Sequence, residues 1–170
     1  MDIINPSSGG AQLLSIPPAQ IQIQSLGGGA VIGAYTTNRI QGIREGRFCT
    51  LFFDLEQSGA GTAGAAGDYY LTLPIGLVAD SAFVIANTSP NAGQKTTPAG
   101  MVQSSFSISG STTIRSDNAT ATFRTMTAFR LHYRTTAGAP EAFNAAGLYK
   151  LSDAALKISG WIRFPVQGWT

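Results

Sequence analysis

The chain has very few of the residues on which disulfide frameworks and metal sites depend. Its 170 residues include one cysteine, Cys49, and one histidine, His132. A single cysteine cannot form a disulfide within the chain, so a disulfide-stapled fold is excluded. One cysteine and one histidine are also too few to close a structural zinc site of the Cys/His type within one chain. The fold must therefore be held by its hydrophobic core, and we expect Cys49 to be a free thiol on a buried strand.

Charge is equally scarce. Charged residues make up 12% of the chain and the net charge is +2, whereas globular domains usually carry about 25% charged residues. Hydrophobic residues account for 44%, and this share together with the small net charge is typical of a folded protein rather than a disordered one. With so few charges, much of the surface is either neutral and polar or covered by neighbouring subunits.

Long apolar runs are absent as well. The sequence contains neither an 18-residue apolar segment nor a basic segment followed by an apolar run. We therefore expect intracellular synthesis, in the cytoplasm, and no membrane partner. The segments Asn87-Thr88-Ser89 and Asn118-Ala119-Thr120 match the glycosylation sequon, and without a leader they are interpreted as turns.

What the chain does contain is a series of short strand patterns. Residues 47–55 are rich in aromatic and bulky apolar side chains and predict a buried strand. Residues 58–67 carry no large side chain and predict a loop, after which residues 69–74 resume the strand pattern. No window shows convincing helical spacing. The sequence predicts an all-β fold, an antiparallel β-sandwich of the jelly-roll type, in a domain of residues 30–170.

Further strands are predicted in the second half of the chain. Residues 81–86 are apolar, residues 105–109 alternate, and residues 119–136 fit one long strand or a bent pair, with turns expected at Ser109-Gly110-Ser111 and Asp117-Asn118. The closing strand has apolar residues of a single parity, interrupted by Gly160, where a bulge is expected. These core-facing residues are Leu156, Ile158, Ile162, Phe164 and Val166.

Residues 1–29 predict an extended N-terminal arm. Prolines and glycines there oppose a helix, residues 20–24 alternate with period two, and residues 27–29 form a glycine joint. The apolar residues of the arm are too sparse for a core of their own, so we expect them to add a strand to a neighbouring chain. These partner-binding residues are Ile3, Ile4, Leu13, Leu14, Ile16, Ile21 and Ile23.

The order of these segments resembles a known group of viral domains. Gly46-Arg47 precede the aromatic strand, Leu73-Pro74 end the next one, and residues 156–169 read LKISGWIRFPVQGW. Together they are similar to the jelly-roll domains of tailed-bacteriophage virion proteins, which include head decoration (cement) proteins, head fibres and tail-fibre tips. The resemblance implies a homotrimer on the capsid exterior whose partners are its sister copies and the major capsid protein. It implies no catalytic residues and no cofactor.

Two roles within the virion stay open. A decoration protein that stabilises the shell is favoured by the short chain, and the alternative is a receptor- or carbohydrate-binding fibre tip, which needs exposed aromatics. Residues Arg130, His132 and Arg134 predict a basic stripe on one sheet face, for which a protein contact is favoured over nucleic acid because the overall charge is nearly balanced. The candidate trimer or receptor contacts are Tyr69, Tyr70, Arg130, His132, Arg134, Trp161 and Trp169.

Three patterns suggest catalysis or cofactor binding but lack a necessary part. Residues 59–64 match G-x-G-x-x-G, yet no helix is predicted after them to bind a phosphate. Cys49 could act as a nucleophile paired with His132, but its apolar neighbours raise the pKa of the thiol and lower its reactivity. Asp54 and Glu56 share one strand face and Asp68 follows the loop, a pattern that glycoside cleavage by two carboxylates would use. Since nine acids are scattered over the chain, a solvated strand end is the favoured interpretation. We therefore predict that the chain is not an enzyme, needs no cofactor or metal, and binds no nucleic acid.

Overall fold

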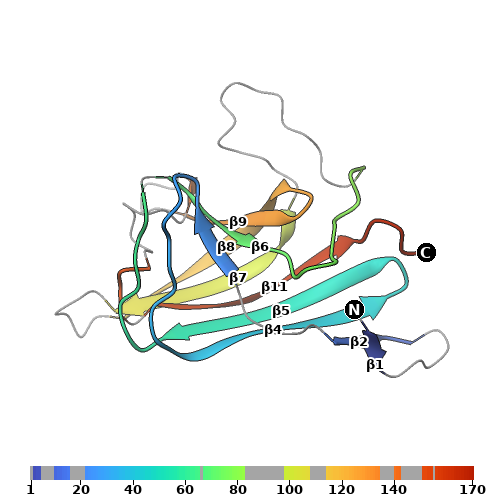
Figure 1. Ribbon diagram of the computed structural model, residues 1–170, viewed down its shortest axis with the longest axis horizontal. Coiled ribbons are helices and arrows are strands. Elements are labelled where there is room, and N and C mark those ends of the chain that lie inside the picture. Colours follow the sequence, from blue (N-terminus) through green and yellow to red (C-terminus); the bar gives the residue numbers. More distant parts are fainter. Residues whose placement is uncertain are drawn as a thin grey trace.

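The computed structural model of the chain describes residues 2–4, 10–15, 22–65, 67–82, 98–107, 114–134, 140–142, 151–154 and 156–170. Within these ranges every regular element is a strand (Figure 1). The strands are β1 (Asp2–Ile4), β2 (Gln12–Ser15), β3 (Gln22–Ser25), β4 (Tyr35–Glu45), β5 (Phe48–Gln57), β6 (Tyr69–Thr72), β7 (Pro98–Ser107), β8 (Ile114–Thr125), β9 (Ala128–Arg134), β10 (Pro140–Ala142) and β11 (Lys157–Pro165).

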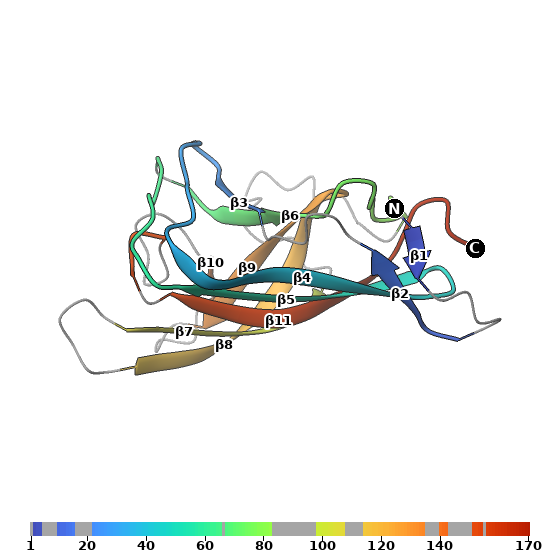
Figure 2. The same cartoon turned by 60° about the horizontal axis from the view of Figure 1, so that its bottom comes forward.

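The strands form a single hydrogen-bonded path that folds back on itself. Its order is β1-β2-β4-β5-β11-β7-β8-β9-β6-β3, with β10 added to β9, and all of these pairings are antiparallel. The twelve-residue β8 pairs with both β7 and β9, and β9 crosses behind β4, β5 and β11 on its way to β6 and β3 (Figure 2). The predicted all-β antiparallel architecture is confirmed, and its two facing layers agree with a β-sandwich.

The core lies between two layers, one that contains β4, β5 and β11 and one that contains β6 and β9. Along β5 every second residue is buried, including Leu51, Phe53 and Leu55. The ring of Phe53 lies 5.7 Å, centroid to centroid, from that of Phe129 on β9. Because one ring comes from each layer, this contact shows that β5 and β9 face each other across the core.

The closing strand β11 occupies the middle of the sheet, between β5 and β7. All five residues predicted to face the core there are buried. The bulge expected at Gly160 is wrong, because the register of β11 against β5 runs from Lys157↔Glu56 to Pro165↔Phe48 without a shift. Flanking strands on both sides hold Gly160 in regular pairing, so the flexibility of glycine is not used there.

Two further local predictions change in the structure. The segment Asp117-Asn118 lies inside β8, paired with Ser104 and Gln103 of β7, instead of forming a turn. Pairing with β7 overrides the turn preference of these residues. The turn falls at residues 126–127, so the bent pair expected over residues 119–136 is the β8–β9 hairpin. Of the strand predicted at residues 81–86, Ser81 and Ala82 form a turn and the rest lies outside the described residues.

The N-terminal segment joins the sheet of its own chain. Strand β3 pairs with β6, and β2 pairs with β4. Leu14 and Ile23 are buried in the core, while Leu13 is partly exposed. Ile3 and Ile4 of β1 stand opposite Leu14 and Leu13 of β2.

This pairing corrects the expectation that residues 20–24 add to a neighbour's sheet. Residues 22–24 of that stretch add to β6 of the same chain, at an edge that the sequence pattern did not reveal. Addition within one chain avoids the translational and rotational entropy cost of joining two molecules. Ile16 and Ile21 lie outside the described residues.

Two small-residue segments, residues 28–34 and 58–65, lie against each other backbone to backbone. Val31 and Thr62 exchange two backbone hydrogen bonds, with N–O distances of 3.0 and 2.9 Å, and Gly61 N donates to Leu151 O at 2.7 Å. The G-x-G-x-x-G segment is therefore docked on its own chain, and the next regular element is strand β6 rather than a helix.

We predict that Gly33→Ala destabilises the protein by about 1–3 kcal/mol, the usual range for overpacking. A Cβ at Gly33 would lie 2.2 Å from Gly59 O and 2.6 Å from Ala60 C, and backbone atoms cannot move aside cheaply. Gly59→Ala is the matched control, since its nearest contact would be Ala34 Cβ at 3.2 Å. Urea unfolding of both variants checks this. Equal midpoints for the two variants would contradict it.

Candidate interaction surface

The predicted contact residues separate into four places. Tyr69 and Tyr70 are neighbours on β6, so their side chains point to opposite faces. Tyr69 is 3% exposed and its hydroxyl donates to Ala63 O at 2.8 Å. Burial raises the pKa of this phenol above its ordinary value. Tyr69 is thus a core residue that fixes the small-residue loop, and it offers no exposed ring for a receptor.

Tyr70 of β6 and Arg130 of β9 stand opposite each other, on the side of these strands that faces away from the core. Tyr70 stands between Gln24 of β3 and Arg130 of β9 in the strand register. Its hydroxyl donates to Gln24 Oε1 at 2.8 Å, and Arg130 Nη1 lies 2.9 Å from Asp68 Oδ2. The contact of Arg130 with an acid is therefore made within the chain. His132 and Arg134 follow on the same strand, but their side chains lie outside the description.

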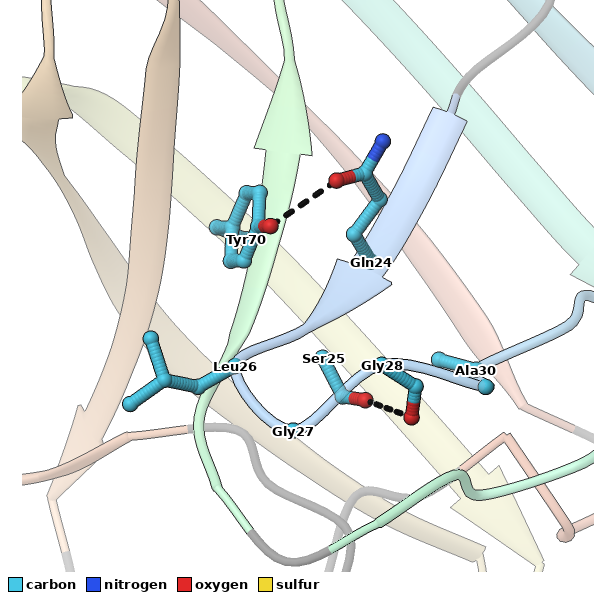
Figure 3. Close-up of a pocket in the computed structure, with 8 residues that line it drawn as sticks. Gln24, Ser25, Leu26, Gly27, Gly28, Ala30 and Tyr70 are labelled. Carbon is cyan, nitrogen blue, oxygen red and sulfur yellow. Dashed lines mark hydrogen bonds between the residues drawn. The ribbon is translucent and has the colours of Figure 1, made fainter.

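A hollow of about 400 Å³ lies beside Gln24 and Tyr70 (Figure 3). It is lined by Gln24, Ser25, Leu26, Gly27, Gly28, Gly29, Ala30 and Tyr70. Two hydrogen bonds lie within it, because the Tyr70 hydroxyl donates to Gln24 Oε1 at 2.8 Å and Ser25 Oγ donates to Gly28 O at 2.7 Å. The rest of its lining is mostly glycine backbone and small side chains.

Trp169 anchors the C-terminal tail. Its ring is partly buried against the core, and the guanidinium carbon of Arg44 lies 4.6 Å from the ring centroid. Arg44 also donates from Nη2 to Thr170 O at 3.4 Å. The ring thus supports a cation–π contact inside the chain, which leaves it less available to a partner than the sequence suggested.

Trp161 lies in the fourth place, the outer face of β4, β5 and β11. It stands directly opposite Phe52 of β5 in the strand register, and the two are exposed by 41% and 44%. We call this pair the aromatic row. Phe52 was not among the predicted contact residues, although the strand alternation contains the signal. Thr50, Phe52, Asp54 and Glu56 share a parity, opposite to that of the buried Leu51, Phe53 and Leu55.

The charges beside the aromatic row neutralise one another. Arg39 Nη2 lies 3.3 Å from Asp54 Oδ2, and Lys157 Nζ lies 3.4 Å from Glu56 Oε2. At the other end Arg163 Nη1 lies 2.7 Å from Glu45 Oε2.

The same arginine also covers an aromatic ring, since its guanidinium carbon is 5.1 Å from the ring centroid of Phe48. Each of these six charged side chains thus has an oppositely charged partner on the same face. The result is an electrically balanced face with two aromatic side chains at its centre, and we call it the outer face.

Cys49 cannot serve as a nucleophile in this structure. Its side chain is fully buried on β5, and burial raises the pKa of the thiol from 9.0 to about 12. The reactive thiolate is therefore strongly disfavoured at neutral pH.

This burial predicts a pH dependence of stability. The thiol stays protonated in the folded state up to about pH 12, whereas in the unfolded chain it ionises near 9.0. The stability that it contributes is complete below pH 9 and is lost as the pH rises towards 12, at about 1.4 kcal/mol per pH unit. Urea unfolding of the wild type and of Cys49→Ala between pH 8 and about 10.5 measures the difference. Equal slopes for the two proteins would contradict the buried, protonated thiol.

Among the residues that the structure describes, no group of three or more His, Cys, Asp or Glu side chains is placed to hold a metal ion. No helix in this part of the chain has the length and hydropathy of a membrane span. Comparison with protein-family models, curated proteins and solved structures finds no match to this chain.

Proposed function

We propose that the chain is a structural virion protein of a tailed phage, a capsid decoration protein that binds the major capsid protein on the shell exterior as a homotrimer. Its sandwich would be a jelly roll carrying an N-terminal attachment segment. It would work mechanically, because subunits that bind only the intact shell stabilise that state by mass action. No catalytic step and no cofactor belong to this role.

The observation that carries the proposal is the N-terminal hairpin. Strand β1 pairs with β2, β2 pairs with β4, and β1 stands at the end of the strand order with one edge unpaired among the described residues. The hairpin lies beside β4 at the margin of the sheet (Figure 1). An unpaired strand edge is a template for strand addition by a partner. We therefore place shell attachment at β1 rather than along the whole of residues 1–29.

The balanced charge of the outer face supports a structural role. Its charged side chains already have partners within the chain, so a docking partner meets little net charge. This arrangement suits permanent assembly better than steered capture of a charged ligand.

The second candidate is a receptor- or carbohydrate-binding fibre tip. The exposed Phe52 and Trp161 favour it, because neighbouring aromatic side chains form a platform that suits the apolar face of a sugar. Polar Gln41 stands beside Phe52 in the strand register, and Ser159 precedes Trp161 by two residues on β11.

Electron microscopy of virions purified from the source of this sequence tests the two roles. An antibody raised against the purified chain and labelled with gold should mark the head surface. Label confined to the tail or its fibres would support the fibre-tip role instead. Virions without label would overturn both roles.

Attachment itself is tested with a shortened chain. Deleting residues 1–10 removes β1 but keeps β2, so the sandwich should stay folded. The fraction of the shortened protein that co-sediments with capsids lacking this protein should fall. The full chain is the reference for binding, and circular dichroism checks the fold. Binding equal to that of the full chain would contradict attachment through β1.

A further inference from the structure

The outer face has the features of a protein interface that is not yet occupied. Specific interfaces place aromatic side chains at a desolvated centre and polar groups at the rim. Here Phe52 and Trp161 hold the centre, and ion pairs flank them towards both strand ends. Exposed aromatic pairs of this kind are costly to leave in water, because large apolar side chains are stabilised by burial.

We propose that this face binds a second copy of the chain through a twofold contact. Consider an axis that runs along the strands, between the two copies and midway between β5 and β11. Rotation by half a turn then lays every outward residue of β5 over the β11 residue that stands opposite it in the register. Phe52 meets the partner's Trp161, and Trp161 meets the partner's Phe52, so the aromatic row is its own complement.

The same rotation makes the charges complementary. Glu56 stands opposite Lys157 in the register of one chain, so Glu56 comes to lie over the partner's Lys157, and Lys157 over the partner's Glu56. Their present pair is 3.4 Å long and its two side chains are 45% and 47% exposed, which leaves both free to exchange partners. A heterologous partner would have to supply this pattern separately, whereas a second copy carries it already.

The area of the outer face sets the expected affinity of the twofold contact. The outer face continues onto β7, which pairs with β11. The four strands β4, β5, β11 and β7, spaced by about 4.8 Å and about 30 Å long, cover roughly 600 Å². This is somewhat less than the roughly 800 Å² per partner of a standard interface. We therefore expect association in the micromolar range. Two aligned sheets cross at about 30°, so the match is tightest at the aromatic row, and the long Glu56 and Lys157 side chains span the offset further out.

The twofold contact is separate from the proposed trimer and is tested separately, by sedimentation equilibrium at micromolar concentrations. A dimer supports the twofold contact and counts against the trimer, and a hexamer supports both. A trimer supports the threefold proposal and overturns the twofold one. A monomer overturns both and leaves the outer face to another occupant, such as a glycan.

Substitutions locate the contact. Phe52→Ser and Trp161→Ser each remove an aromatic side chain that occurs twice in the dimer, and each should raise the dissociation constant of the dimer by about 100-fold or more. Ile75→Ser is the matched control, since Ile75 is 97% exposed and lies outside the outer face. Equal dissociation constants for the wild type and the two aromatic variants would overturn the proposal.

A charge exchange tests the orientation of the two copies. In Glu56→Lys the twofold contact sets the introduced lysine against the partner's Lys157, and in Lys157→Glu it sets two glutamates together. Each variant alone should associate at least about 5-fold more weakly than the wild type. An equimolar mixture should regain wild-type association as a one-to-one heterodimer, because both interfacial pairs are then of opposite sign. A mixture that associates no better than the separate variants would rule out this twofold arrangement.

Discussion

Ile162→Asp should leave the chain without a cooperative fold. Ile162 is fully buried on β11, where it stands between Leu51 of β5 and Gly100 of β7. An aspartate there loses roughly 1.5–3 kcal/mol of apolar burial. It must also either bury an unpaired carboxylate or bind a proton at neutral pH, which costs several kcal/mol more. The sum is comparable with the roughly 5–15 kcal/mol that usually stabilises a whole domain.

Thermal unfolding followed by circular dichroism measures this effect. Gln167→Asp introduces the same carboxylate at an exposed position just beyond β11 and should shift the melting temperature by only a few degrees. Ile162→Val removes one methylene group without adding charge and should cost about 0.5–1.5 kcal/mol. A sharp transition for Ile162→Asp near the wild-type temperature would show that β11 is not central to the core.

The inward faces of the long strands could be predicted from the sequence, because strand alternation is a local property. Leu156, Ile158, Ile162 and Phe164 share a parity and are all buried. The same rule, applied fully, distinguishes the two tyrosines of β6. Tyr69 shares its parity with the buried Leu71 and Leu73, whereas Tyr70 does not, so only Tyr70 could have been an outward contact.

The candidate surface was less predictable because it depends on which strands become neighbours. Phe52 and Trp161 are far apart in the sequence, and only the β5–β11 register sets them side by side. The alternation shows that each of them faces outward, but nothing local shows that they face outward together. For the same reason the ion pairs of Arg39, Lys157 and Arg163 could not be foreseen.

The destination of the N-terminal segment depended on the same non-local information. The period-two pattern of residues 20–24 correctly indicates a strand, since Gln22–Ser25 forms β3. It cannot say whose sheet that strand joins. A free edge on β6 of the same chain decides the matter, and truncation of this segment should therefore affect the fold.

Deleting residues 1–24 should therefore destabilise the sandwich itself. The deletion removes the buried Leu14 and Ile23 and the pairing of β2 with β4 and of most of β3 with β6. Loss of two buried aliphatic side chains costs about 3–6 kcal/mol in total. It also exposes the buried Leu71, which stands opposite Ile23 in the register. The free energy of unfolding in urea should fall by at least this amount, with aggregation where the remaining margin is small.

Deleting only residues 1–10 separates the two parts of the segment. This shorter deletion removes β1, which pairs with β2 alone among the described strands, and leaves Leu14 and Ile23 in place. Its cost to the free energy of unfolding should be within about 1 kcal/mol, because the strand is three residues long and lies at the end of the strand order. If the longer deletion proved as stable as the shorter one, β2 and β3 would be removable from the core. The whole segment would then be an independent arm, available to a neighbouring subunit as the sequence pattern alone suggests.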